Sequence, residues 1–151
     1  MYDNSGDGYM FHLGGTVVEM AELPAQSDGQ LAAVSPTCCI TFTGDALEPI
    51  THLESRDRAG LQRYADCLKQ IIDYVNAPTR YAEGLGRTPH IFYCSSSSVP
   101  MRMQDAEAVL QACREVLAGE TGSDIPAGSV PTQRMHLVNN CGIVYDTAKL
   151  G

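Results

Sequence analysis

A run of four serines lies between a predicted strand and a predicted helix, with an arginine close behind it. The hydroxyls belong to Ser95, Ser96, Ser97 and Ser98, and the arginine is Arg102. Backbone amides at the N-terminus of a helix, together with hydroxyls and a guanidinium, form the kind of site that holds a phosphate group. A phosphate- or sugar-phosphate-binding module or enzyme is therefore one hypothesis. The alternative is that Ser98 caps the helix and that the other serines form a solvated loop.

The same segment offers a candidate nucleophile, because Cys94 directly precedes the serines. A cysteine, a loop and an arginine in this order resemble the arrangement in cysteine phosphatases, in which loop amides and the arginine stabilise the thiolate. That family has a shorter, glycine-rich loop, whereas seven residues and no glycine separate Cys94 from Arg102. Cys94 with His90, and Cys141 with His136, have the residue types of a nucleophile and its base. The spacing selects neither pair, so we assign no catalytic residue.

The distribution of charge is the clearest compositional signal. The first 55 residues contain eight carboxylates and neither lysine nor arginine, whereas residues 56–151 contain ten basic and ten acidic side chains. The whole formal charge of -8 therefore belongs to the opening third of the chain. Such a charge disfavours direct binding to nucleic acid or to anionic membranes. It favours a basic protein, or a nucleic-acid-binding protein, as the partner.

Six carboxylates of this opening third form the predicted partner-binding surface. If they cluster in space, their electric field speeds the encounter with a basic partner. The alternative is a solvated sheet face whose charge prevents aggregation. The six residues are Glu19, Glu22, Asp28, Asp45, Glu48 and Glu54.

The opening third is also predicted to be rich in strands. Residues 9–13 and 16–23 are alternating or β-branched, and residues 31–34 return after a Ser-Asp-Gly turn. Residues 37–43 form the clearest strand, with apolar and polar side chains on opposite faces. Cys38, Ile40 and Phe42 lie on one face, and Thr37, Cys39, Thr41 and Thr43 lie on the other. We expect the apolar face in the core and the polar face toward water.

The rest of the chain alternates helices with strands. Apolar residues recur at helical spacing over residues 61–75, before Pro78, and again over residues 106–117, before Gly119. Residues 89–94 form a buried strand, and a hairpin turns at Asn139 and Asn140. The predicted order is four strands, helix, strand, helix and two strands. It predicts a single α+β domain over residues 1–151, with a mixed, mainly antiparallel sheet, two helices packed on one face and a flexible leader at residues 1–8.

Bulk composition narrows the class of protein further. A length of 151 residues with 44% hydrophobic residues fits one globular domain. No apolar run is long enough for a membrane helix, and the opening residues lack the pattern of a signal peptide, so a cytoplasmic location is expected. The six cysteines include no C-x-x-C pair, which predicts free thiols and no zinc site. No metal or other cofactor is expected.

We therefore predict a small soluble protein that acts by binding another protein and not by catalysis. An inhibitor, an immunity-type protein and a phage or bacterial assembly subunit each fit this description. Phosphate or sugar-phosphate binding at the serine loop is the alternative. A self-assembling structural protein, which forms homo-oligomers through its edge strands, is the third hypothesis.

Overall fold

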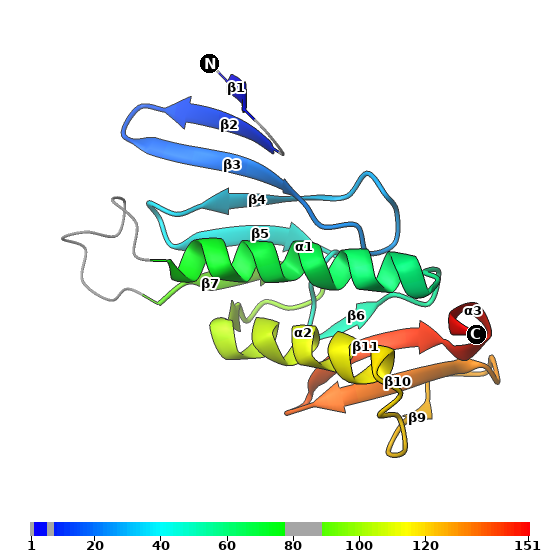
Figure 1. The fold of residues 1–151 in the computed structure, drawn as a ribbon. Coiled ribbons are helices and arrows are strands. Elements are labelled where there is room, and N and C mark those ends of the chain that lie inside the picture. Colours follow the sequence, from blue (N-terminus) through cyan, green and yellow to red (C-terminus); the bar gives the residue numbers. More distant parts are fainter. Residues whose placement is uncertain (1, 6–7, 78–88) are drawn as a thin grey trace.

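The strands are divided between two sheets (Figure 1). The computed structural model describes residues 2–5, 8–77 and 89–151, with the backbone alone at residues 2–5, 8–9 and 12–13. The larger sheet consists, in spatial order, of β1 (Tyr2–Ser5), β2 (Gly8–Leu13), β3 (Thr16–Glu22), β4 (Leu31–Ser35), β5 (Ile40–Gly44), β7 (Ile91–Cys94) and β8 (Met101–Arg102). The smaller sheet consists of β6 (Ile50–His52), β11 (Cys141–Asp146), β10 (Gln133–Val138) and β9 (Ile125–Pro126).

Two long helices form a layer in front of these sheets. They are α1 (Arg58–Asn76) and α2 (Met103–Leu117), and a short α3 (Thr147–Leu150) lies near the C-terminus. Figure 1 shows α1 across the larger sheet and α2 across the smaller one, side by side and running in opposite directions. The predicted α+β class, with mixed and mainly antiparallel strand pairing and two packed helices, is confirmed. The difference is that the strands form two sheets and not one.

A tight turn after β5 accounts for the second sheet. Gly44 has a φ of 57°, and the Ala46 amide donates a hydrogen bond to the Thr43 carbonyl at 2.9 Å. The Thr43 hydroxyl donates to the Leu47 carbonyl at 2.8 Å. The chain therefore leaves the larger sheet, and β6 pairs in parallel with β11. Alternation of polar and apolar residues carries no information about such a turn.

Helix α1 forms as its sequence pattern predicts. The Asp57 side chain accepts a hydrogen bond from the Gly60 amide at 2.8 Å and caps the N-terminus. The Tyr64 hydroxyl donates to the Ala46 carbonyl at 2.6 Å, which fastens the helix to the turn after β5. Its fully buried stripe consists of Leu61, Tyr64, Ala65, Leu68, Ile71 and Ile72. The helix ends at Asn76, and Pro78 lies outside the described residues.

Helix α2 also follows its predicted apolar stripe. Its buried residues include Ala106, Val109, Leu110, Cys113 and Val116. Gly119, with a φ of 81°, follows its end as predicted. Burial raises the pKa of the Cys113 thiol to about 12, and all six cysteines are free thiols. No helix in the described ranges is long and apolar enough to cross a membrane.

Strand β5 turns its threonines toward the core, which reverses the predicted orientation. Thr41 is 0% exposed and Thr43 is 3% exposed, whereas Phe42 between them is 55% exposed. The Thr41 hydroxyl lies 2.6 Å from Nε2 of the buried His90, and the Thr43 hydroxyl is bonded to the Leu47 carbonyl. Burial of a hydroxyl is tolerated when it has a hydrogen-bond partner. The prediction that the apolar face of residues 37–43 lies in the core was therefore wrong.

Two element boundaries also differ from the sequence prediction. Thr37, Cys38 and Cys39 belong to the turn between β4 and β5, and the Cys39 amide donates to the Pro36 carbonyl at 3.2 Å. Cys39 has a φ of 57°, which a regular strand does not allow. Residues 2–5, in the predicted leader, form β1 and pair antiparallel with β2.

The hairpin of β10 and β11 combines the predicted turn with an unexpectedly close backbone contact. Asn139 and Asn140 have φ values of 51° and 69°, as a two-residue hairpin turn requires. Gly142 follows them, and a Cβ atom added there would lie 1.9 Å from the His136 carbonyl oxygen. A side chain at this position must therefore push the two strands apart.

We predict that Gly142→Ala destabilises the protein by about 1 to 3 kcal/mol, the usual cost of overpacking a rigid site. Chemical denaturation of the purified variant measures the change. Gly122→Ala is the matched control, because an added Cβ there meets no atom within 4 Å. Equal stability of the two variants would show that the close approach is absent in solution.

Candidate functional site

The serine loop connects two strands and does not lead into a helix. Residues 95–98 join β7 to β8, and α2 begins only at Met103. The Ser95 amide donates to the Gly44 carbonyl at 2.9 Å, and the Ser97 hydroxyl bonds within its own turn to Val99. At the start of α2, the Asp105 carboxylate accepts from the Arg102 amide at 2.9 Å. The phosphate hypothesis stays a prediction, but it no longer has a helix N-terminus to support it.

Part of the predicted acidic surface is paired with the basic residues of α1 and of the loop before it. Glu22 forms an ion pair with Arg63 at 3.0 Å, and Asp28 forms one with Arg56 at 2.6 Å. The side-chain hydrogen bond to Glu22 is the main cause that raises the pKa of Arg63. Ion pairs at a protein surface contribute little to stability, because water screens them. Their main effect here is that two of the carboxylates are neutralised within the chain.

The other acidic candidates have different surroundings. Asp45 accepts a hydrogen bond from the Gln30 side chain at 2.7 Å, which brings it to the loop that contains Asp28. Glu54 lies 3.3 Å from His52, and Glu48 is buried. Glu19 is paired across the sheet with Val34, whose side chain is in the core, so it lies on the helix-covered face. Asp45 thus lies beside the loop that contains Asp28, whereas Glu19 and Glu48 have other surroundings.

The face of the larger sheet opposite the helices carries an apolar row that sequence reasoning did not assign to the surface. Cross-strand pairing joins Met20 to Ala33, Ala33 to Phe42 and Phe42 to Tyr93. Directly paired side chains point to the same side of a sheet. We call this side the open face. The large apolar residues exposed on it are Phe11, Leu31, Phe42 and Tyr93.

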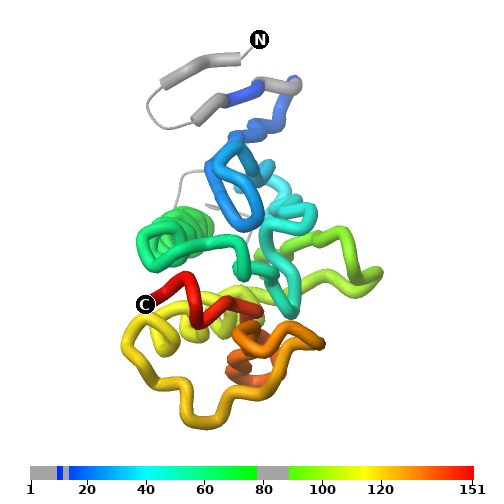
Figure 2. The backbone as a smooth tube through the Cα atoms, turned by 90° about the vertical axis from the view of Figure 1, so that its right-hand side faces the viewer, coloured from blue at the N-terminus to red at the C-terminus, as the bar shows by residue number. Residues whose placement is uncertain are grey.

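The opposite side of the same strands is packed. Val34, Thr41 and Phe92, which alternate with the open-face residues, are all nearly or fully buried. Figure 2 shows both long helices on one side of the strands, with the open face turned the other way. The two sides of β4, β5 and β7 therefore differ sharply in burial, whereas β3 is half-buried along most of its length.

An aromatic pair lies on the open face where β5 meets β7, next to the β8 edge of the sheet. The rings of Phe42 and Tyr93 are stacked, with centroids 5.6 Å apart and planes 20° apart. Phe42 is 55% exposed and Tyr93 is 38% exposed. Arg102, one of the residues predicted to bind an anion, is paired with Ile91 and is exposed on this same face. The face therefore presents flat aromatic surface with a cation at its β8 edge.

The exposed aromatic side chains of the open face offer apolar area for a partner to bury. A fully buried aromatic side chain covers about 150 to 250 Å². At their observed exposures, Phe11, Phe42 and Tyr93 leave on the order of 250 Å² in water. Burial of that area is worth about 6 kcal/mol at roughly 25 cal/mol per Å². Aromatic residues are enriched in the buried cores of protein interfaces.

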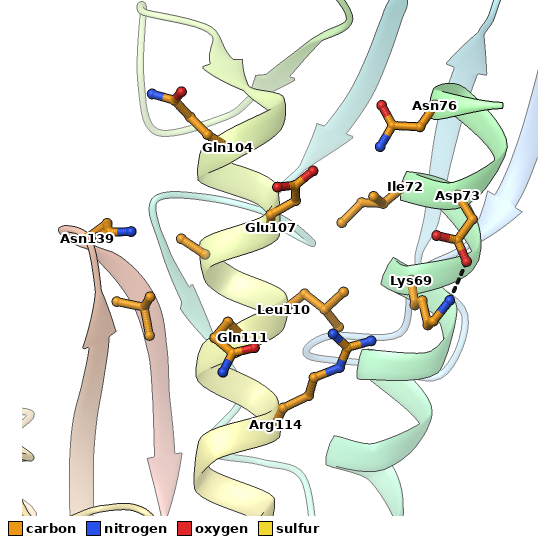
Figure 3. A pocket seen from close by; sticks show the side chains of 12 residues that line it. Lys69, Ile72, Asp73, Asn76, Gln104, Glu107, Leu110, Gln111, Arg114 and Asn139 are labelled. Carbon is orange, nitrogen blue, oxygen red and sulfur yellow. Dashed lines mark hydrogen bonds and ion pairs between the residues drawn. The ribbon is translucent and has the colours of Figure 1, made fainter. Parts of the chain in front are cut away.

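A groove of about 620 Å³ between α1 and α2 is the rival site (Figure 3). Its floor of Ile72, Ala108 and Leu110 is already buried, so a ligand would remove little further apolar area from water. Its walls are polar, and Figure 3 shows the Lys69–Asp73 ion pair on the α1 side. Solvated wall charges of this kind contribute about 0.2 to 1 kcal/mol each. The groove therefore offers less binding energy than the open face.

Neither cysteine–histidine pair forms a nucleophile and its base. His90 bonds to Thr41, and burial lowers the pKa of its imidazole to about 4. Cys141 lies 3.9 Å from Asp105, while both ring nitrogens of His136 bond to carboxylates. In the described part of the chain, no group of three or more His, Cys, Asp or Glu side chains is arranged to hold a metal ion.

We predict that Phe42→Ala changes the free energy of unfolding by less than about 1 kcal/mol, because its ring is largely in water, whereas Phe92→Ala costs about 3 to 5 kcal/mol. Urea denaturation of the two variants measures both values. The residues are matched in type and lie on paired neighbouring strands. A loss of the same size for both would place Phe42 in the core and rule out the open face.

Comparisons with protein-family models, with curated proteins and with solved structures found no match to this chain.

Proposed function

We propose that this protein acts by binding another protein through the open face of its larger sheet. The observation that supports the proposal most directly is the stacked Phe42–Tyr93 pair, whose rings remain largely in water. Aromatic side chains are the residue type most enriched at the energetic centres of protein interfaces. An inhibitor, an immunity-type protein or a cytoplasmic phage or bacterial assembly subunit would each use such a surface. The chain is proposed to bind and not to catalyse.

The proposed partner is a basic protein. Strands β1 to β5 of the larger sheet come from the first 55 residues, which contain eight carboxylates and no lysine or arginine. The sheet that presents the open face is therefore built mainly from the acidic third of the chain. A partner of opposite charge is steered toward this surface, and its rate of association falls as salt screens the attraction.

A second copy of the chain is the less favoured occupant. Two copies would bring two net charges of -8 together. Repulsion of this kind disfavours a symmetric dimer at low salt. Self-assembly is a separate hypothesis, and sedimentation of the isolated protein tests it.

The test compares three versions of the chain: the wild type, the double variant Phe42→Ser with Tyr93→Ser, and the control Leu137→Ser. Leu137 is 42% exposed on β10, so the control removes an exposed apolar side chain from the other sheet. Tagged protein captures its partner from the native host, and binding constants are then measured with the purified partner. The double variant is expected to bind at least about 30-fold more weakly, the loss that defines an interface hot spot.

The control and the wild type are expected to bind equally, and both are expected to weaken between about 50 mM and about 300 mM salt. If the double variant binds the purified partner as tightly as the wild type does, the proposal is contradicted. Sedimentation of the wild type alone is the second check. If the wild type sediments as a dimer and the double variant as a monomer, the occupant of the open face is a second copy of the chain and not a basic partner.

A further inference from the structure

His136 lies between two carboxylates in the smaller sheet. Its side chain is 3% exposed, and its Nδ1 atom lies 2.5 Å from Asp124 Oδ1. Its Nε2 atom lies 3.0 Å from Glu115 Oε1. His136 belongs to β10, Glu115 to α2 and Asp124 to the loop after α2. One imidazole ring thus joins three separate segments.

The geometry requires a protonated ring. A neutral imidazole has one donor nitrogen and one acceptor nitrogen, so it cannot donate to both carboxylates, whereas the imidazolium donates from both. Burial alone lowers the pKa of His136, but hydrogen bonds to Asp124 and Glu115 outweigh that effect and raise it above the ordinary value. In turn, the hydrogen bond from His136 lowers the pKa of Glu115. The raised pKa of His136 and the lowered pKa of Glu115 both favour an ion pair between these two side chains.

Asp124 links this cluster to the segment of residues 119–132. Its second carboxylate oxygen accepts a hydrogen bond from the Tyr145 hydroxyl of β11, and its carbonyl accepts one from the Arg134 guanidinium at 2.6 Å. The next two residues, Ile125 and Pro126, form β9 and pair with the edge of β10. The position of Asp124 thus fixes a short strand that covers the edge of the smaller sheet.

We propose that Glu115, His136 and Asp124 form a pH-sensitive latch that holds residues 119–132 against α2 and β10, and that it loosens when His136 loses its proton. Other polar groups also face the cluster. The Tyr145 hydroxyl donates to Asp124, the Gln111 amide donates to Glu115 at 2.9 Å, and Arg134 bonds to the Asp124 carbonyl. None of them can replace the lost proton between the ring and its two carboxylates. Loosening would release β9 and leave the edge of β10 open to another strand.

The direction of the pH dependence follows from the raised pKa. Stabilisation by His136 is fully present below the ordinary histidine value of 6.5 and is lost as the pH rises through the higher value of the folded protein. The lowered pKa of Glu115 has the opposite effect at low pH. Stabilisation by the hydrogen bond between Glu115 and His136 is lost as the pH falls below the ordinary glutamate value of 4.5. The latch is therefore closed below pH 6.5 and opens as the pH rises through the higher pKa of His136 in the folded protein.

The test is hydrogen exchange of the whole chain between about pH 6 and about pH 9, with each amide corrected for its intrinsic rate. We expect protection of residues 119–132 to fall severalfold over this range in the wild type, while the amides of α1 stay protected. His136→Gln should remove the pH dependence of the segment. His52→Gln is the control, because His52 is a half-exposed histidine that also faces one carboxylate, Glu54.

Unchanged protection of residues 119–132 across this range in the wild type would overturn the proposal, as would the same pH dependence in His136→Gln. If that variant does not fold, an NMR titration of the wild-type protein measures the pKa of the His136 imidazole and tests the proposal instead. A His136 ring that titrates above 6.5 together with the loss of protection supports the latch. A ring that titrates at or below 6.5 contradicts it.

Discussion

The hydrogen bond between Thr41 and His90 decides which side of the larger sheet faces the helices. Both groups are buried, and the short contact between them satisfies a hydroxyl and a ring nitrogen that would otherwise be costly inside the protein. Thr43 is satisfied in the same way by the Leu47 carbonyl. With the threonines inside, the alternation of a strand forces Phe42 and the paired Tyr93 to the outside.

This constraint leads directly to the proposed function. Helix α1 covers the threonine side through the contact of Tyr64 with Ala46, so the aromatic side stays in water. An uncovered row of apolar residues on an acidic sheet is a surface on which hydrophobic burial supplies the energy and charge directs the approach. The six predicted carboxylates therefore have a smaller role than the sequence suggested. Two are paired within the chain, and Glu48 is buried.

Much of the fold could be predicted from the sequence, because its helices have strong local signals. The stripe of α1, the stop at Gly119 and the turn at Asn139 and Asn140 each depend on nearby residues. The orientation of β5 depends on His90, which is far away in the sequence, and periodicity cannot tell which of two alternating faces is buried. The latch at His136 was missed for the same reason, since Asp124 and Glu115 approach it only after folding. Sequence reasoning named Arg102 but not the aromatic pair on the same face.

The central claim is that the free protein exposes one side of its larger sheet and buries the other. Hydroxyl-radical footprinting of the isolated chain at low concentration measures this most directly, because neighbouring side chains on paired strands are compared within one sample. The account predicts rapid oxidation of Phe42 and Tyr93 and strong protection of Phe92, which is 0% exposed. Protection of Phe42 and Tyr93 equal to that of Phe92 would contradict it.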